Sequence, residues 1–159
     1  MNIFTYDNIS AVQYAKKWAF LRNPAYYNFD KFGGDCTNFI SQCLFAGCKI
    51  MNFTPTFGWY YNNINDRAPA WSGVNEFYRF ITTNNSYGPF GKLSTYYQMQ
   101  IGDVIQLFNG QKYYHSLFIS SIIDREIFTA SHTINSFDKP LSSYNFVSAR
   151  YIKILGYRK

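Results

Sequence analysis

The 159-residue sequence predicts an α+β domain in which N-terminal helices pack on a C-terminal antiparallel sheet. Helical spacing of apolar residues is found in the first half of the chain, and runs of β-branched and aromatic residues bounded by turn residues occupy the second half. The length suits one hydrophobic core, and the chain shows no internal repeat and no linker-like segment. We therefore expect residues 1–159 to form a single domain.

Apolar faces next to capping residues predict three helices, which span 8–21, 36–46 and 73–82. Asp7 is the expected N-cap of the first helix, which ends before Asn23-Pro24 because a residue that precedes proline avoids the helical conformation. We expect Gly47 to stop the second helix and Ser72 to cap the third. The apolar residues of the second helix share one face, which predicts that this helix is packed rather than exposed.

The second half of the chain predicts four strands, which span 104–108, 115–123, 126–131 and 151–155. Asn109-Gly110 and Asp124-Arg125 are the expected hairpin connections between consecutive strands. Residues 49–70 are rich in turn-forming and aromatic residues, so we expect a surface loop that could border a site.

The composition points to an anionic partner but not to nucleic acid. The net charge is +6, from 15 Lys+Arg against 9 Asp+Glu, which suits a cell-wall polymer or an acidic carrier protein. The basic residues are scattered and form no Lys/Arg-rich segment of the kind that binds nucleic acid. The aromatic share is 21%, so tyrosines are expected both in the core and in the walls of a cleft that holds a small-molecule or peptide substrate.

The cysteine and histidine content predicts reduced thiols and no metal site. The three cysteines lack C-x-x-C spacing, and two histidines do not complete a zinc set. Cys43 and Cys48 are expected to be buried as small hydrophobic residues. The N-terminus lacks the features of a signal peptide and no segment is apolar enough to cross a membrane, so a cytoplasmic location is expected. The sequence has no cofactor-binding fingerprint, and it does not indicate an oligomeric state.

The most informative segment is Gly33-Gly34-Asp35-Cys36-Thr37-Asn38-Phe39-Ile40-Ser41-Gln42, read together with His115. Cys36 is expected at the first position of the second helix, where free N–H groups and the helix dipole favour a thiolate. The two glycines would let a substrate approach, and the Cys36 N–H could donate to an oxyanion. His115, on a predicted strand, is the candidate base in a thiolate–imidazolium pair.

A catalytic histidine needs a group that orients its second ring nitrogen. His132 ends the strand after that of His115 and is the first candidate, with Asn135 and Asp138 as alternatives. Asn38 could help at the oxyanion or could satisfy the helix terminus instead. The candidates for oxyanion or substrate binding are Asp35, Asn38, Gly34 and Tyr114.

Several motifs resemble one bacterial enzyme family. They are Tyr14-Ala15, Asn23-Pro24-Ala25-Tyr26, Phe29, the run from Gly33 to Gln42, Trp71-Ser72, Ile101-Gly102-Asp103-Val104-Ile105, His115-Ser116, Ser131-His132-Thr133 and Pro140-Leu141. Together they resemble the bacterial putative amidase domain, which belongs to the wider papain-like group of NlpC-type and CHAP cell-wall hydrolases. The resemblance implies a papain-like thiol-enzyme fold with Cys36 as nucleophile and His115 as base. Similarity to the Cys-His-His arrangement of related hydrolases implies His132 as the third member.

The expected activity is acyl transfer through a Cys36 thioester, and hydrolysis of an amide or peptide bond is the preferred form. The alternative is an acyltransferase that moves an acyl group from a thioester or carrier protein to an amine in a cytosolic biosynthetic pathway. The wealth of aromatic residues and the lack of export or wall-binding features favour that alternative over routine peptidoglycan hydrolysis. An inactive ligand-binding protein on the same fold is the third possibility.

Overall fold

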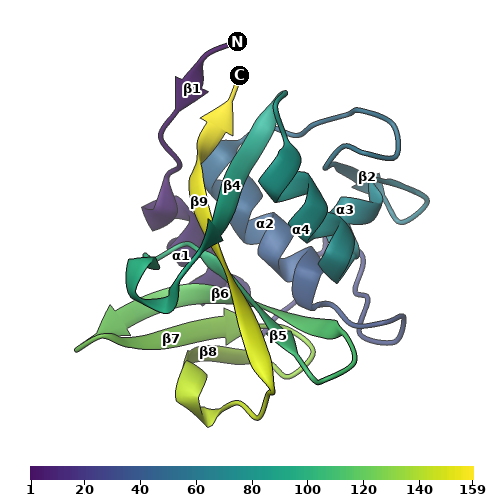
Figure 1. Ribbon diagram of the computed structural model, residues 1–159. Helices are drawn as coiled ribbons and strands as arrows, with labels where there is room; N and C mark the ends of the chain where they lie inside the picture. The colour runs from purple at the N-terminus through teal and green to yellow at the C-terminus, as the bar shows by residue number, and fades with distance from the viewer.

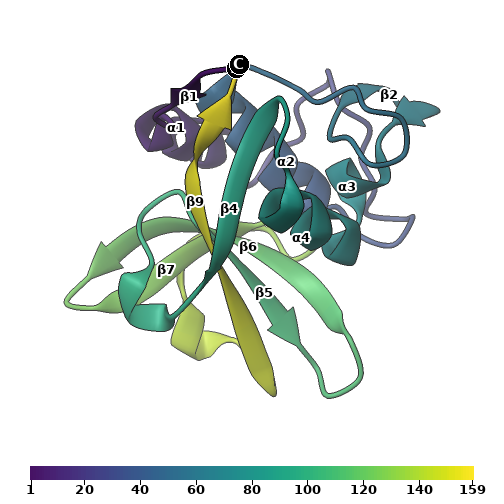
Figure 2. The same cartoon turned by 45° about the horizontal axis from the view of Figure 1, so that its top comes forward.

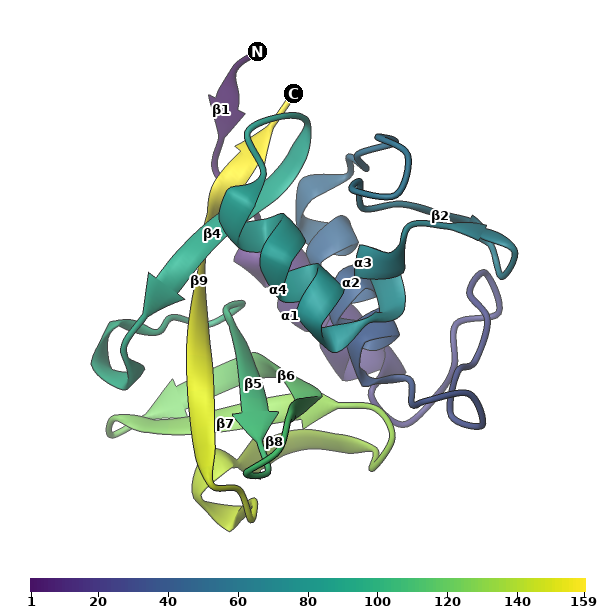
Figure 3. The same ribbon diagram turned by 45° about the vertical axis from the view of Figure 1, so that its right-hand side comes forward.

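The computed structural model describes residues 1–159, and it shows helices and a large antiparallel sheet, as the sequence predicts. The helices are α1 Asn8–Trp18, α2 Cys36–Cys48, α3 Pro69–Ser72 and α4 Val74–Thr83. Figure 1 shows α2, α3 and α4 beside the long strands of the sheet, and Figure 3 shows α1, α2 and α4 gathered on one side of the last strand. The α+β class is confirmed.

The large sheet has seven strands, and neighbouring strands are antiparallel. They are β1 Ile3–Phe4, β4 Gly88–Ser94, β5 Val104–Phe108, β6 Tyr113–Ile123, β7 Glu126–Ser131, β8 Ser136–Pro140 and β9 Ser148–Arg158. The order is β1-β9-β5-β6-β7-β8, and β4 also pairs with β9. Figure 2 shows β5, β6 and β7 fanning out below the helices, while β4 and β9 run up beside them. The pairing of β1 with β9 brings the two ends of the chain together.

The four predicted strands are present, but three others were not expected. The strand β5 has the predicted bounds, β6 begins two residues earlier than predicted, and β9 extends beyond its prediction at both ends. Asp124 and Arg125 have φ angles of 50° and 69°, which confirms the tight turn between β6 and β7. The unexpected strands β1, β4 and β8 lack the β-branched runs on which the prediction rests.

Three predicted helix boundaries are wrong. Helix α1 ends at Trp18, three residues before the predicted end at residue 21. Gly47 lies inside α2, where a glycine is required because an added Cβ would collide with the ring of Tyr6 and the carbonyl oxygen of Asp7. Lys49 ends the helix instead, with a φ of 55°. Ser72 does not cap α4: it is the last residue of α3, and Gly73 precedes α4 without any side-chain cap. The predicted loop at 49–70 also contains a two-stranded sheet, β2 Tyr61–Asn63 and β3 Asp66–Arg67.

Helix α2 is the centre of the main core. Twelve of its thirteen residues are buried, so it is packed on all sides rather than on one face. The core cluster of 21 buried residues joins α1, α2 and α4 to the sheet, and a second cluster of seven lies around β5, β6 and β7. The Thr37 hydroxyl contacts the Ser116 hydroxyl at 2.9 Å, which fixes the start of α2 on β6. No helix has both the length and the apolar character that a membrane crossing requires.

Candidate active site

Cys36 and His115 line the same cavity, which has a volume of about 300 Å³. Cys36 is the first residue of α2, and His115 lies near the start of β6, directly before the residue that contacts Thr37. Their exposed fractions are 5% and 8%, so both side chains are largely shielded from solvent. The structure therefore brings the predicted nucleophile and the predicted base into one cavity.

The loop before α2 leaves the cavity open next to the thiol. Gly33 and Gly34 both line the cavity, and their φ angles are 87° and 100°, a region that glycine adopts without steric cost. A Cβ on Gly34 would lie 3.1 Å from the Thr133 hydroxyl oxygen. Gly34 is thus required for the turn and for its close contact with the loop after β7.

Burial raises the pKa of the Cys36 thiol above its ordinary value. Hydrogen bonds from the backbone N–H of Ser116 and from the hydroxyl and N–H of Thr37 oppose this shift but do not cancel it. The backbone N–H of Cys36 donates to no backbone carbonyl oxygen, as expected for the first residue of a helix. This N–H is therefore free to donate to an oxyanion that forms on a carbonyl attacked by Sγ.

His115 is a neutral imidazole at neutral pH. Burial, the larger cause, and the positive charge of Lys139 together lower its pKa to about 4. Its ring lies near the rings of Tyr114 and Tyr144, with centroid separations of 6.0 Å and 6.2 Å. Together with the raised pKa of Cys36, these shifts favour a neutral thiol–imidazole pair over the expected thiolate–imidazolium pair.

The prediction that His132 orients His115 is wrong, because both ring nitrogens of His132 have other partners. Nδ1 lies 2.6 Å from the Asp35 carboxylate, and Nε2 lies 2.8 Å from the carbonyl oxygen of Trp18. The Trp18 carbonyl can only accept, so Nε2 donates to it, while Nδ1 makes a close contact with the Asp35 carboxyl group. His132 is 1% exposed and stacks on Phe39 at a centroid separation of 4.0 Å. His132 and Asp35 form a buried ion pair.

The two alternatives for the third catalytic position are also engaged elsewhere. The Asn135 side-chain oxygen accepts a hydrogen bond from the Arg22 guanidinium at 2.9 Å. The Asp138 carboxylate accepts from the hydroxyls of Ser120 and Ser121 at 2.6 Å and 3.1 Å. None of the three residues proposed from sequence therefore holds the imidazole of His115.

Asp35 and Asn38, two of the predicted oxyanion- or substrate-binding residues, lie behind the cavity rather than in its lining. Neither residue is exposed. Asp35 accepts hydrogen bonds from the Phe29 N–H at 2.8 Å and from the Asn38 amide at 2.9 Å. The Asn38 oxygen accepts from the Trp71 indole at 2.9 Å. By contrast, Gly34 and Tyr114 line the cavity, where the sequence places them.

The buried network around Asp35 fixes one wall of the cavity. The Asp35 N–H donates to the Thr133 hydroxyl at 3.0 Å. The Asp35 carboxylate contacts the ring of His132, which directly precedes Thr133. Arg22 donates to Asn135 on the other side of the same loop. These contacts hold Thr133 at a φ of 83°, which is unusual for a β-branched residue. The aspartate of the Gly-Gly-Asp-Cys motif therefore positions the loop whose residues Thr133 and Ile134 line the cavity.

The remaining cavity residues could not be found from sequence. They lie on the unexpected strand β8, on the short helix η2 Leu141–Ser143 and just after it: Lys139, Ser143, Tyr144 and Asn145. Their part of the chain has no motif that points to chemistry. Only the fold shows that this segment faces the start of α2 across the cavity.

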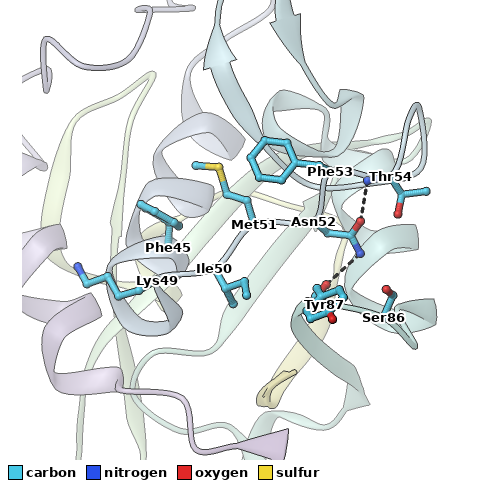
Figure 4. A pocket seen from close by; sticks show the side chains of 9 residues that line it. All are labelled: Phe45, Lys49, Ile50, Met51, Asn52, Phe53, Thr54, Ser86 and Tyr87. Carbon is cyan, nitrogen blue, oxygen red and sulfur yellow. Dashed lines mark hydrogen bonds between the residues drawn. The ribbon is translucent and has the colours of Figure 1, made fainter. Parts of the chain in front are cut away.

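A larger cavity, of about 740 Å³, lies at the opposite end of α2 (Figure 4). Its lining includes Phe45 and Lys49 from the C-terminal end of that helix, and neither a cysteine nor a histidine is among the nine residues. A helix of this length spans about 20 Å, so the larger cavity is remote from Cys36. No group of three or more His, Cys, Asp or Glu side chains is placed to hold a metal ion. The smaller cavity is the candidate active site.

The family model of the putative amidase domain matches residues 5–155. The chain belongs to this family. It is 35% identical over 104 residues to the uncharacterized protein YhbB of Bacillus subtilis, a match that covers 64% of this chain and 32% of YhbB. It is 26% identical over 145 residues to the uncharacterized protein YjcM of the same organism, covering 85% of this chain and 32% of YjcM. The matched region thus spans about a third of each relative's length. No solved structure matches.

Proposed function

We propose that this domain is a cysteine-dependent amide hydrolase that acts through a thioester on Cys36. The observation that carries the proposal is the meeting of Cys36 and His115, from segments far apart in sequence, in one cavity. Membership of the putative amidase domain family supports an amide as the bond that is cleaved. The helix that carries the thiol packs on the antiparallel strand that carries the imidazole, and on this basis we infer a papain-like arrangement with a Cys-His pair.

The acylation step begins from the neutral pair. The Cys36 sulfur attacks the amide carbon while its proton passes to the neutral imidazole of His115. The carbonyl electrons move to oxygen, and the resulting oxyanion accepts a hydrogen bond from the Cys36 N–H. When the tetrahedral intermediate collapses, the C–N bond breaks and the leaving amine takes the proton from His115. The acyl group then remains on Cys36 as a thioester.

Deacylation reverses the direction of the proton. His115 removes a proton from a water molecule as its oxygen attacks the thioester carbon; when the C–S bond breaks, His115 returns this proton to the leaving Cys36 sulfur. The products are a free acid and the Cys36 thiol. Water is the acceptor that the cavity favours, because several lining residues reach solvent: the exposed fractions of Ile134 and Tyr114 are 68% and 37%. An amine acceptor would give the acyltransferase alternative by the same chemistry.

Intact-mass spectrometry with a panel of acyl anilides and acyl thioesters tests the proposal. The protein, Cys36→Ala and His115→Asn are compared, with Cys43→Ala as a control that removes a buried thiol outside the cavity. We expect an acyl adduct on Cys36 that water releases, no adduct in Cys36→Ala, and slower acylation in His115→Asn. Release that requires an added amine would instead support the acyltransferase. Turnover that survives Cys36→Ala would refute the thiol mechanism, and no adduct from any compound would favour a binding protein.

A further inference from the structure

Lys139 is the one charged side chain in the lining of the active-site cavity, since His115 is neutral there. The Lys139 ammonium lies 4.0 Å from the centroid of the Tyr144 ring, so an aromatic face supports it. It takes part in no ion pair: the ion pairs of the structure join Arg22 and His132 to Asp30 or Asp35. A half-buried cation without a carboxylate partner thus faces the same space as the nucleophile.

The nearby carboxylates do not neutralise this charge. Asp138, the preceding residue, accepts hydrogen bonds from two serine hydroxyls on β6. Asp35 is fully buried behind the cavity and is held by His132 and Arg22. The field of Lys139 nevertheless reaches the catalytic imidazole, because it contributes to the lowered pKa of His115. The cavity therefore offers an uncompensated positive charge to whatever enters it.

We propose that Lys139 selects acyl substrates that carry a carboxylate close to the bond that Cys36 attacks. This inference rests on the proposed function, because it assumes that a substrate reaches Cys36 through this cavity. A substrate carboxylate would pair with the ammonium, while the scissile carbonyl lies between Cys36 and His115. The ammonium itself lies over the Tyr144 ring, so the charge is held in place before the substrate arrives.

Binding of such a substrate would also tune the base. A carboxylate at Lys139 cancels the positive charge that lowers the pKa of His115, so the imidazole becomes a stronger base when the right substrate is bound. A neutral substrate of the same shape leaves the charge in place. Lys139 would therefore affect the chemical step as well as binding, although it touches the substrate away from the reacting carbon.

Alkylation of Cys36 by two reagents of similar shape and different charge tests the inference without any substrate. Iodoacetate carries a carboxylate next to its reactive carbon, and iodoacetamide carries a neutral amide. The rate of labelling at Cys36 is measured for both reagents by peptide mass spectrometry at one pH and low ionic strength, and the ratio of rates removes any change in thiol reactivity. The variants are Lys139→Gln, Lys139→Arg and, as a control on exposed β4, Lys92→Gln.

We expect Lys139→Gln to lower the iodoacetate-to-iodoacetamide ratio by at least roughly fivefold, because removal of one charge at about 4 Å has this effect in water and partial burial strengthens it. Lys139→Arg should keep the ratio within about twofold because it keeps the charge, and Lys92→Gln should not change it. An unchanged ratio in folded Lys139→Gln would overturn the inference. So would the failure of both reagents to label Cys36, since the thiol would then not be reached through the cavity.

A matched pair of substrates separates this inference from the proposed function. The pair consists of two acyl anilides that differ only by a carboxylate or a carboxamide next to the scissile bond. Faster hydrolysis of the carboxylate compound, with the preference lost in Lys139→Gln, supports both proposals. Hydrolysis without preference for charge overturns the role of Lys139 and leaves the hydrolase standing. Charge-dependent alkylation without hydrolysis of any amide or thioester leaves Lys139 as an anion-binding residue and refutes the hydrolase.

Discussion

Replacement of His132 should destabilise the protein and leave the nucleophile largely intact, because this residue belongs to a buried ion pair. Two variants each remove one of the two contacts made by the ring nitrogens. In His132→Asn, the amide nitrogen takes the place of Nδ1 and can still donate to Asp35, while the bond to the Trp18 carbonyl is lost. In His132→Gln, the amide nitrogen takes the place of Nε2, so the Trp18 carbonyl keeps a donor and Asp35 loses one.

The contacts predict which of the two variants loses more stability. Loss of a hydrogen bond to a charged group costs about 1.5–3 kcal/mol, and an unsatisfied buried carbonyl costs about 1–3 kcal/mol. Both variants also lose the stacking on Phe39, which is worth about 0.5–1.5 kcal/mol. His132→Gln leaves the Asp35 charge with only Arg22 as a cationic partner, at 3.4 Å, so its total should reach about 3–5 kcal/mol. His132→Asn should cost less, because Asp35 keeps a donor.

Urea unfolding followed by tryptophan fluorescence measures these losses, since Trp59 and Trp71 are fully buried in the core. Alkylation of Cys36 by iodoacetamide is measured on the same folded samples. We expect the urea midpoint of unfolding to be highest for the wild type, lower for His132→Asn and lowest for His132→Gln. The rates of Cys36 alkylation should lie within a few-fold of one another. A stability loss below about 1 kcal/mol, together with a drop in Cys36 reactivity as large as in His115→Asn, would restore His132 to a catalytic role.

Three further predictions concern titration and packing. Alkylation of Cys36 should accelerate with pH up to and beyond the ordinary thiol value of 9.0, and a plateau between about pH 5 and 8 would indicate an ion pair instead. His115 has a pKa of about 4 in the folded protein against 6.5 ordinarily, so the unfolded chain binds its proton first as the pH falls. The resulting contribution to stability, about 3 kcal/mol, is present above pH 6.5 and is lost as the pH falls to 4. Unfolding of His115→Asn should lack this pH dependence. Gly47→Ala should lower the free energy of unfolding by about 1–3 kcal/mol, because the added methyl group would meet Tyr6. This loss should outweigh alanine's better helix propensity, and an unchanged urea midpoint would contradict this packing.

The fold class and the central part of each long helix and strand could be predicted, because the spacing of apolar residues indicates which side chains are buried. The apolar face and capping aspartate of α1 and the β-branched runs of β5, β6 and β7 depend on interactions that are local in sequence. What was missed depends on distant partners. Strand β4 contains two glycines and a proline and is a strand because β9 pairs with it. Gly47 is a glycine because Tyr6 packs against it and not because it ends the helix, and no local signal reports that contact.

The candidate site divides in the same way. Cys36 was placed by local signals, namely the glycine pair and the position at a helix start, and these signals hold in the structure. Asp35 and His132 carry charges and occur in motifs, so the sequence suggested chemistry for both. Only the contacts show that they satisfy each other inside the protein. Lys139 was missed although it stands between Asp138 and the Pro140-Leu141 motif, because neither assigns a role to the lysine itself.

These assignments together suggest why the reactive pair is held neutral. Burial moves the pKa values of Cys36 and His115 in opposite directions, so proton transfer from thiol to imidazole is unfavourable before a substrate binds. The Asp35–His132 ion pair holds the loop after β7 in a fixed position, so the cavity cannot relax around the thiol at little cost. A carboxylate bound at Lys139 would be the missing charge that makes transfer easier. On this view the site is unreactive toward acyl groups that lack a carboxylate, because the charge that balances Lys139 arrives with the substrate, and the charge-matched anilides should show that dependence in the rate of acylation itself.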